Sequence, residues 1–391
     1  MKISMFVHSL GDNPIVRAKP IAEALMAMGH EVQILGLLIN ADDVYRPYRG
    51  MFNYVTMRSS DSIWDVYRMA RKLSRLADGD IVYACKPLVS SFFPALVYTD
   101  YGREKPIILD VEDDDVMYQR PSSMNDWFPM LFRGWRKAFN YKFNIPLDRY
   151  VSRCSGVTVS SEKLRRHYGG KIMLTGPAQV KKTCDIGSCE QVLLKRRFGL
   201  PSDKYVLLFA GTARLHKGFD IIAQGALDPR FSDHFHLALA GDPEQALFKD
   251  MKRQLGADCS LLGLFDSDNV FEVIGASDIV PVIQKHCVYT ESQIPAKLLE
   301  AFACGRPVIG SRIGDLPHLI LDGPHRPRGW ILEKRSAADF VELLLAIIRS
   351  DGRLLASRGL AGISFYKDNC STMAIQRVLQ SFKILSGSTI S

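Results

Sequence analysis

Short apolar runs alternate with amphipathic stretches along the whole chain, and this alternation restricts the folds that are open to it. The runs expected to form strands are residues 3–7, 32–35, 81–84, 107–111 and 156–159 in the first half, and 205–210, 236–240, 279–282 and 308–310 in the second. Short buried strands separated by helical patterns, such as the helix expected at 16–28, are typical of βαβ units with parallel sheets. The sequence therefore predicts the α/β class.

The length of the chain predicts more than one domain. Its 391 residues exceed one ordinary hydrophobic core, and a polar segment at 181–203 separates the two series of runs. We expect a doubly wound parallel-sheet domain over residues 1–180 and a second over 181–370, facing each other across a cleft. Residues 371–391 are expected to contain a helix that packs back across the domains.

Composition excludes several classes of protein. The net charge of +8 is moderate and comes without a dense basic run, which argues against a nucleic-acid-binding protein. The eight cysteines contain no C-x-x-C pair, so neither a metal site nor a disulfide framework is expected. No window approaches 18 consecutive apolar residues, and the N-terminal apolar run is too short for a signal sequence. We therefore expect a cytoplasmic protein.

The stretch 291–310, ESQIPAKLLEAFACGRPVIG, combines a helix with polar residues on one face. Pro295 suits the first helical turn, and Gly305 suits the end of the helix before the apolar run that follows. Lys297 and Glu300 are three residues apart near the positive end of this helix, where a diphosphate and a ribose could bind. The alternative is an ordinary amphipathic helix in which these two residues form a solvated pair.

The loop 211–218, GTARLHKG, directly follows a predicted strand. In doubly wound folds ligands bind beyond the carboxyl ends of the strands. Gly211 would let the backbone approach a ligand, while Arg214 and Lys217 would bring two positive charges to a departing pyrophosphate. The alternative is a basic surface turn. Gly241 follows a predicted strand and Gly263 follows Leu261 and Leu262, and both could border a base-binding pocket.

A run of four acids, residues 112–115, follows another predicted strand. Neighbouring carboxylates repel one another, so some should be partly protonated or held by basic partners. Glu112 or Asp113 could stabilise a sugar cation or take a proton from an acceptor hydroxyl. The alternative is a solvated loop that caps a helix. His8 and Lys86 end other strands and are further candidates on the acceptor side.

Basic and aromatic residues interleave in the segment 130–153. Helices of this composition can lie at a membrane interface, which would suit an acceptor carried on a lipid diphosphate. The alternative is a long helix that covers the domain and whose aromatic side chains belong to the core.

The second half of the chain resembles the nucleotide-sugar-binding domain of glycosyltransferase family 4, the retaining enzymes of GT-B architecture. The resemblance rests on GTARLHKG at 211–218, AGD at 240–242 and PAKLLEAFACGRPVIGS at 295–311, in this order and spacing. The first half fits through the loop with Gly11, through Arg17 at the start of a helix, and through the segment 155–164. The resemblance implies two Rossmann-like domains.

The resemblance also implies roles for particular residues. Arg214 and Lys217 would bind the donor diphosphate, and Glu300 would bind the ribose. The start of the helix would hold the distal phosphate, through Ala296, Lys297 and Leu298.

The chain departs from the family pattern at two places. The family's acidic pair would place its first glutamate at Ser292, whereas the nearest acid is Glu291, one residue away. Gln293 is a possible substitute for it. The family often has a histidine where this chain has Glu112.

These observations predict a metal-independent transferase without a cofactor, and the family resemblance implies that it retains the anomeric configuration. Its donor would be a nucleotide-diphosphate sugar, and its acceptor a glycan or lipid-linked glycan in cell-surface polysaccharide synthesis. The alternatives are a nucleotide-sugar epimerase of the same architecture and a non-catalytic binding protein. A dehydrogenase is disfavoured because no Gly-x-Gly-x-x-Gly loop follows the first strand.

Overall fold

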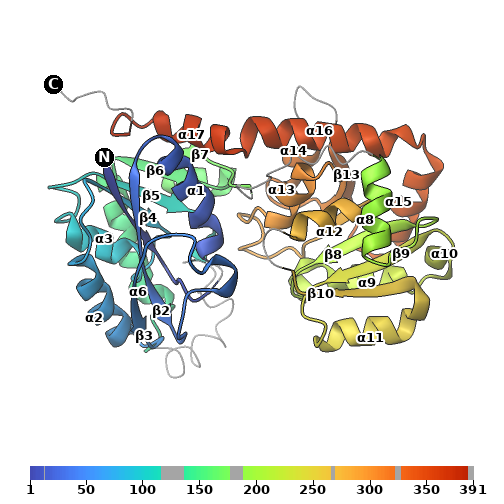
Figure 1. Ribbon diagram of the computed structural model, residues 1–391, viewed down its shortest axis with the longest axis horizontal. Coiled ribbons are helices and arrows are strands. Elements are labelled where there is room, and N and C mark those ends of the chain that lie inside the picture. The colour runs from blue at the N-terminus through green and yellow to red at the C-terminus, as the bar shows by residue number, and fades with distance from the viewer. Residues whose placement is uncertain (13, 116–135, 177–187, 266–268, 322–326, 386–391) are drawn as a thin grey trace. The chain divides into compact units, whose positions relative to one another are not determined.

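The computed structural model describes residues 1–12, 14–115, 136–176, 188–265, 269–321 and 327–385 (Figure 1). The chain divides into two compact units. Unit 1 comprises residues 1–178 together with 372–391, and unit 2 comprises residues 179–371. Each unit is built on parallel strands with helices between them.

Unit 1 is built around a seven-stranded parallel sheet in the order β3-β2-β1-β4-β5-β6-β7. Its strands are β1 (Lys2–Val7), β2 (Glu31–Ile39), β3 (Tyr54–Ser59), β4 (Ile81–Cys85), β5 (Ile107–Val111), β6 (Gly156–Val159) and β7 (Lys171–Ile172). Its helices are α1 (Ile15–Ala27), η1 (Arg46–Tyr48), α2 (Ile63–Ser74), α3 (Phe92–Tyr98), α6 (Tyr141–Asn144), η2 (Ile145–Arg153), α7 (Glu162–Tyr168) and α17 (Thr372–Gln380).

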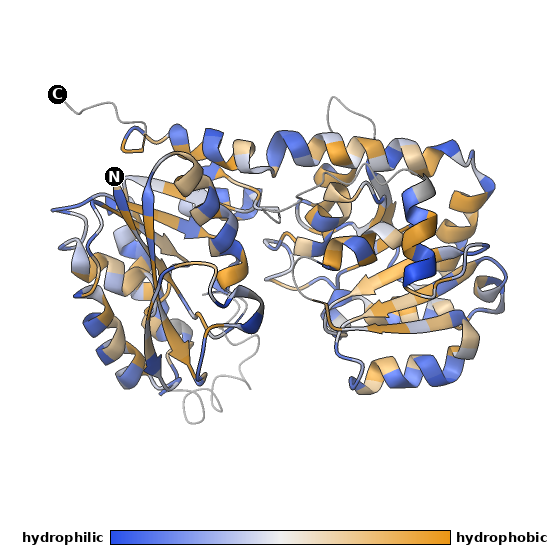
Figure 2. Ribbon diagram, in the orientation of Figure 1, coloured by the Kyte–Doolittle hydropathy of each residue, from blue (hydrophilic) through white to orange (hydrophobic). Residues whose placement is uncertain are grey.

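Successive residues of β1 supply two separate hydrophobic clusters, because side chains alternate between the two faces of a strand. Met5 and Val7 pack in one cluster with α1 and α17, while Phe6 packs in the other with α2 and α3. The central strands are accordingly hydrophobic along their length (Figure 2). Helices therefore cover both faces of this sheet, as in a doubly wound fold.

Unit 2 contains two three-stranded parallel sheets, β10-β9-β8 and β11-β12-β13, which an isolated parallel bridge between Leu207 and Ile279 connects. Its strands are β8 (Tyr205–Ala210), β9 (Phe235–Ala240), β10 (Cys259–Gly263), β11 (Val280–Val282), β12 (Val308–Ser311) and β13 (Gly329–Leu332). Its helices are α8 (Ser188–Arg197), η3 (Leu215–Lys217), α9 (Phe219–Ala226), α10 (Pro229–Ser232), α11 (Ala246–Leu255), η4 (Gly256–Asp258), α12 (Val270–Ala276), α13 (Ala296–Ala303), α14 (Leu316–Leu321), α15 (Ala337–Arg349) and α16 (Arg353–Asn369).

Local sequence explains where some of these helices begin. The Ser336 side chain accepts a hydrogen bond from the backbone N–H of Asp339, which caps the start of α15. Pro295 precedes α13 in an extended conformation, with ψ of 128°, so the helix begins one residue later than the sequence predicts. An N-cap residue keeps a non-helical ψ, and proline tolerates this position because it has no N–H to satisfy.

Each predicted strand is present, and β3, β7, β10 and β13 were not predicted from the sequence. β3 lies at the edge of its sheet and is only partly buried, so its residues do not form a continuous apolar run. β7 has two residues, both exposed. Among the described residues, no helix is both long enough and apolar enough to cross a membrane.

A buried ion pair joins α1 to the sheet of unit 1. Arg17 Nε lies 2.7 Å from Asp110 Oδ2, and Arg17 Nη2 lies 2.8 Å from Asp110 Oδ1. The exposed fractions of the two side chains are 5% and 1%. Arg17 Nη1 also donates to Thr175 Oγ1, and Thr158 Oγ1 donates to Asp110. Each charge is thus neutralised and hydrogen-bonded inside the unit.

We expect Arg17→Met to lower the free energy of unfolding by about 3 kcal/mol or more, because it leaves the Asp110 carboxylate buried without its cation. Urea denaturation measures this change. Arg253→Met is the matched control, since Arg253 pairs with Asp250 on the surface and should change the free energy by less than about 1 kcal/mol. Equal effects of the two substitutions would contradict a structural role for the buried pair.

Candidate functional site

The carboxyl ends of three neighbouring strands in unit 2 carry glycines. The N–H of Gly211 donates to Ala240 O, and the N–H of Gly241 donates to Gly263 O, both at 2.8 Å. A Cβ on Gly241 would lie 2.7 Å from Gly211 O, and Gly211 has φ of 108°. Side chains are therefore excluded here, and the edge presents bare backbone on which a flat ligand could lie.

The basic loop after β8 folds back against the end of β11. The N–H of Lys217 donates to Arg214 O, and the N–H of Lys285 donates to His216 O. Gly218 has φ of 70°, and a Cβ there would lie 2.6 Å from Ile283. This packing fixes the loop, in which Arg214 is exposed and Lys217 is partly buried. The pKa of Lys217 is lowered by burial and by the nearby positive charge of Arg214.

Lys297, at the start of α13, is a buried ammonium group close to these cations. Its Nζ lies 4.6 Å from the centroid of the Phe209 ring and has no hydrogen-bond partner within the described residues. Burial and the charge of Lys217 lower the pKa of Lys297 to about 7. Burial also raises the pKa of Glu300 to about 7, against the opposing effect of Lys297. A cation without a carboxylate within bonding distance is suited to an anionic ligand.

The backbone at the start of α13 is only partly available. The N–H of Leu298 donates to Pro295 O at 2.9 Å, and the Leu298 side chain is fully buried. Leu298 therefore contributes to packing, and any phosphate at this helix end would meet Ala296 and Lys297.

The residues before α13 have partners of their own. Glu291 Oε1 lies 2.6 Å from His286 Nε2, in an exposed pair. Gln293 Oε1 accepts a hydrogen bond from Gln284 Nε2 at 3.2 Å, and Gln284 N donates to Ser311 Oγ. Gln284 was not predicted from the sequence, because nothing in its local pattern distinguishes it from other residues at the end of a strand.

In unit 1 the predicted residues His8, Lys86 and Glu112 follow three adjacent strands, β1, β4 and β5. Lys86 Nζ lies 2.9 Å from Asp115, 3.5 Å from Asp113 and 3.9 Å from Glu112. The backbone of Lys86 has φ of 77°, a left-handed conformation that costs energy for any residue except glycine. The acidic run is thus positioned by a basic partner, one of the two outcomes that the sequence predicted.

Burial shifts the pKa values of Glu112 and His8 in this cluster. Burial and then Asp113 raise the pKa of Glu112 to about 7. Burial and the charge of Lys86 lower the pKa of His8 to about 3, so the imidazole is neutral at pH 7. The His8 ring packs edge-on against Phe139, with centroids 4.5 Å apart, and Nδ1 contacts Ser90 Oγ. Within the described residues, no group of three or more acidic, histidine or cysteine side chains is arranged to hold a metal ion.

The structure shows packing contacts for the other residues predicted on the acceptor side. The guanidinium group of Arg17 is occupied by Asp110. A Cβ on Gly11 would lie 2.4 Å from the Ala41 Cβ, so glycine is needed there for close packing. Their roles in acceptor binding stay predictions.

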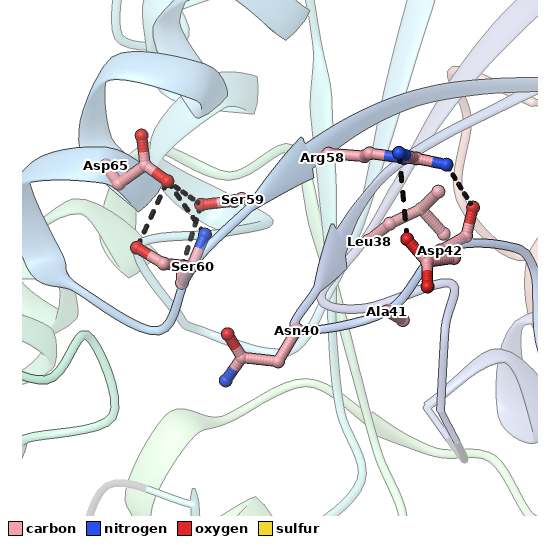
Figure 3. Close-up of a pocket in the computed structure, with 8 residues that line it drawn as sticks. All are labelled: Leu38, Asn40, Ala41, Asp42, Arg58, Ser59, Ser60 and Asp65. Carbon is pink, nitrogen blue, oxygen red and sulfur yellow. Dashed lines mark hydrogen bonds and ion pairs between the residues drawn. The ribbon is translucent and has the colours of Figure 1, made fainter.

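A cavity of about 320 Å³ lies beside Ala41, at the carboxyl ends of β2 and β3 (Figure 3). Arg58 Nη2 donates to Asp42 O on one side, and Asp65 accepts from the N–H of Ser60 on the other. Asn40 projects between these pairs (Figure 3). The lining offers both donors and acceptors, as a polyhydroxyl ligand requires. This cavity was not predicted from the sequence.

Only part of the basic-aromatic segment lies within the described residues, because 130–135 fall outside them. Its described part is not one long helix but the short helix α6 followed by η2. Phe143 and Tyr150 pack against the core, and Asn144 Oδ1 accepts from the N–H of Val89. These aromatic side chains are therefore used in packing.

The part of the chain that contains the basic loop and α13 is similar to one known family. Residues 204–350 match the Glycosyl transferases group 1. This match contains Arg214, Lys217, Lys297 and Glu300, and it supports the prediction of a group 1 glycosyltransferase.

Curated relatives are similar to part of the chain. The N-acetyl-alpha-D-glucosaminyl L-malate synthase of Bacillus anthracis is 24% identical over 159 residues, which are 40% of each chain. The D-inositol 3-phosphate glycosyltransferase of Stackebrandtia nassauensis is 30% identical over 190 residues, which cover 45% of this chain and 41% of the relative. The chain thus matches about 40% of the length of these relatives.

A solved structure matches almost the whole chain. The structure of Anabaena Alr3699/HepE in complex with UDP and glucose aligns with 99% of both chains, at a TM-score of 0.68 and 15% identity. The likeness confirms the predicted α/β class and the GT-B type of fold.

The pKa of Lys297 predicts how stability depends on pH. An unfolded lysine titrates near 10.5, so between about pH 7 and 10.5 the unfolded state binds more protons, and the free energy of unfolding rises with pH. We expect Lys297→Met to be more stable than the parent protein at pH 7, by about 1 kcal/mol or more, and to lose this advantage toward pH 10. Urea denaturation from pH 7 to 9.5 measures both.

Lys334→Met is the matched control, because Lys334 is exposed in the same unit. The difference in free energy of unfolding between Lys334→Met and the parent protein should not vary with pH. If the corresponding difference for Lys297→Met were independent of pH, burial would not disfavour the charged form of Lys297.

Proposed function

We propose that the protein transfers a sugar from a nucleotide-diphosphate sugar to an acceptor hydroxyl. The observation that carries this proposal is the cluster of Arg214, Lys217 and Lys297 inside the segment that matches group 1 glycosyl transferases. Lys297 is held in this segment without an anionic partner within bonding distance. Two structural neighbours are complexes with UDP and glucose or with UDP-glucose, which supports a donor of this class.

The cations would stabilise the diphosphate as it leaves the sugar. Arg214 offers a planar pair of donors to phosphate oxygens, while Lys217 and Lys297 offer compact charges. A bound diphosphate favours the protonated form of Lys297 and would restore the charge that burial disfavours. With this charge supplied by side chains, the departure of the diphosphate needs no metal ion.

Residues at the start of α13 and at the carboxyl ends of the unit 2 strands would make the remaining contacts with the nucleotide sugar. The free N–H groups at Ala296 and Lys297 would hold the distal phosphate. Glu300 would accept hydrogen bonds from the ribose hydroxyls, and the bare backbone at Gly211 and Gly241 would lie against the nucleotide.

The acceptor would bind to unit 1. Glu112, with a pKa of about 7, can hold a proton or release it near neutral pH, so it is the candidate to take the proton of the attacking hydroxyl. Neutral His8 can orient that hydroxyl through a hydrogen bond. We further propose retention of configuration and a glycan or lipid-linked acceptor in polysaccharide synthesis, by likeness to the family.

We expect Arg214→Ala and Lys217→Ala each to lower the transfer rate by about two orders of magnitude, because each removes a charge that stabilises the leaving diphosphate. Lys249→Ala is the matched control, since Lys249 is an exposed cation of the same unit and pairs with Glu244. Release of nucleoside diphosphate is the measurement. Parent-like activity in both variants would refute the assignment of the diphosphate site.

A thermal-shift screen against UDP-, GDP-, ADP- and dTDP-sugars identifies the donor, because a ligand that binds the native state raises the melting temperature. Incubation of that donor without acceptor then separates a transferase from an epimerase. A new epimer of the sugar would show isomerisation in place of transfer.

The pKa of Glu112 predicts the pH dependence of transfer. If the carboxylate takes the acceptor proton, kcat/KM should rise with pH up to about 7 and then level off. We expect Glu112→Gln to lower the plateau by about 100-fold and to abolish this rise. Glu104→Gln, which removes an exposed acid of the same unit, should keep the profile of the parent protein. An unchanged profile in Glu112→Gln would exclude the role as base.

A further inference from the structure

The helix α2 presents an outer face that is unusual for a surface helix. Its inner face, with Val66, Ala70 and Leu73, packs into the core. Trp64 and Tyr67 project outward, with exposed fractions of 71% and 42%. An indole left 71% exposed loses the stabilisation that burial would give it, which suggests that it is covered in another state.

The rest of this outer face is basic. Arg68, Arg71, Lys72 and Arg75 are all exposed, and residues 66–77 contain no acid. Residues 64, 68, 71 and 75 are spaced by three or four, so they form one stripe about 16 Å long. We call Trp64, Tyr67 and these four cations the α2 face. Figure 1 shows that α2 lies on the outside of unit 1.

The nearby acids have partners other than Arg71, Lys72 and Arg75. Asp65 binds Arg68 and also accepts from the backbone of Ser60, while Asp61 lies 3.0 Å from Lys137 Nζ. Beyond the helix, Asp78 pairs with Lys2. The charge of Arg71, Lys72 and Arg75 is therefore not balanced within the α2 face.

The basic-aromatic segment of the sequence meets the start of α2. The N–H of Ile63 donates to Arg136 O, and the N–H of Ala138 donates to Asp61 O. Arg136 and Lys137 are exposed, so two more basic residues adjoin the end of the α2 face that carries Trp64.

We propose that the α2 face binds the surface of an anionic lipid bilayer. Tryptophan and tyrosine rings are stabilised among lipid headgroups, and a stripe of unbalanced cations is attracted to anionic lipid. A stripe of cations and aromatic rings along one helix suits a flat and extended charged surface. This contact does not depend on the proposed transfer reaction.

The cavity in Figure 3 adjoins the first turn of α2. Asp65 lines that cavity, and Trp64 is the adjacent residue on the first turn of α2. A bilayer against the α2 face would therefore lie next to the cavity, where the headgroup of a lipid-borne molecule could enter from the membrane surface.

Vesicle co-sedimentation tests the proposal, with phosphatidylcholine vesicles that contain about one third phosphatidylglycerol. The parent protein should bind these vesicles and bind pure phosphatidylcholine far more weakly. The triple variant Arg71→Ala, Lys72→Ala, Arg75→Ala should lower the partition coefficient about 100-fold, since each cation near the surface contributes about fivefold. The matched control Lys249→Ala, Arg253→Ala, Arg353→Ala removes the same net charge from exposed positions of unit 2 and should bind like the parent protein.

The fluorescence of Trp64 locates the contact. Addition of anionic vesicles should shift the tryptophan emission of the parent protein to shorter wavelength, and Trp64→Phe should lose most of this shift while it still sediments with the vesicles. No binding by the parent protein, or binding that the triple variant leaves unchanged, would overturn the proposal. Tight binding of an RNA or DNA oligomer with no vesicle binding would assign the face to a nucleic acid instead.

Discussion

Parallel pairing of the strands is the constraint from which the position of each candidate residue follows. In a parallel sheet all carboxyl ends lie at the same edge, so residues that end different strands meet without being close in sequence. In unit 1 this places His8, Lys86 and Glu112 on adjacent strands. In unit 2 it aligns Gly211 with Gly241. Chemistry-bearing side chains and bare backbone therefore collect at one edge of each sheet, while the strands themselves build the core.

The buried charge of Lys297 is balanced differently from that of Arg17, Lys86 and Lys195. In unit 1, Arg17 meets Asp110 and Lys86 meets three carboxylates, so each buried cation has oppositely charged neighbours. In unit 2, Lys195 pairs with Asp278, whereas Lys297 lies near an aromatic ring and the like charge of Lys217, and the nearby Glu300 forms no ion pair with it among the described residues. Charge that is balanced internally stabilises a fold, whereas charge that is left unbalanced favours an external anion. The unbalanced charge of Lys297 is the physical reason for our proposal that the diphosphate binds to unit 2.

Sequence patterns predicted the secondary-structure elements better than they predicted the contacts between side chains. The strands expected at 156–159 and 205–210 form with those bounds, because both are buried apolar runs with turn residues nearby. β3 was missed because an edge strand is half exposed and lacks that run. Spacing suggested that Lys297 and Glu300 share a helix face, yet it could not show that Phe209 lies under the ammonium group, since that contact joins residues 88 positions apart. In the segment 130–153, for which a membrane contact was one of two interpretations, Phe143 and Tyr150 of the described part pack against the core, and no periodicity in that segment pointed to α2.

The return of the chain from unit 2 to unit 1 affects the order in which the protein can be assembled. Ile375, Leu379, Phe382 and Leu385 pack in the same cluster as the residues of α1 and β1. During synthesis unit 2 is complete before these side chains leave the ribosome, although unit 1 begins first. Until then one hydrophobic surface of unit 1 stays uncovered. The unit that is synthesised first is thus the last to be completed, and a ribosome that stalls within α16 would release a chain with that surface exposed.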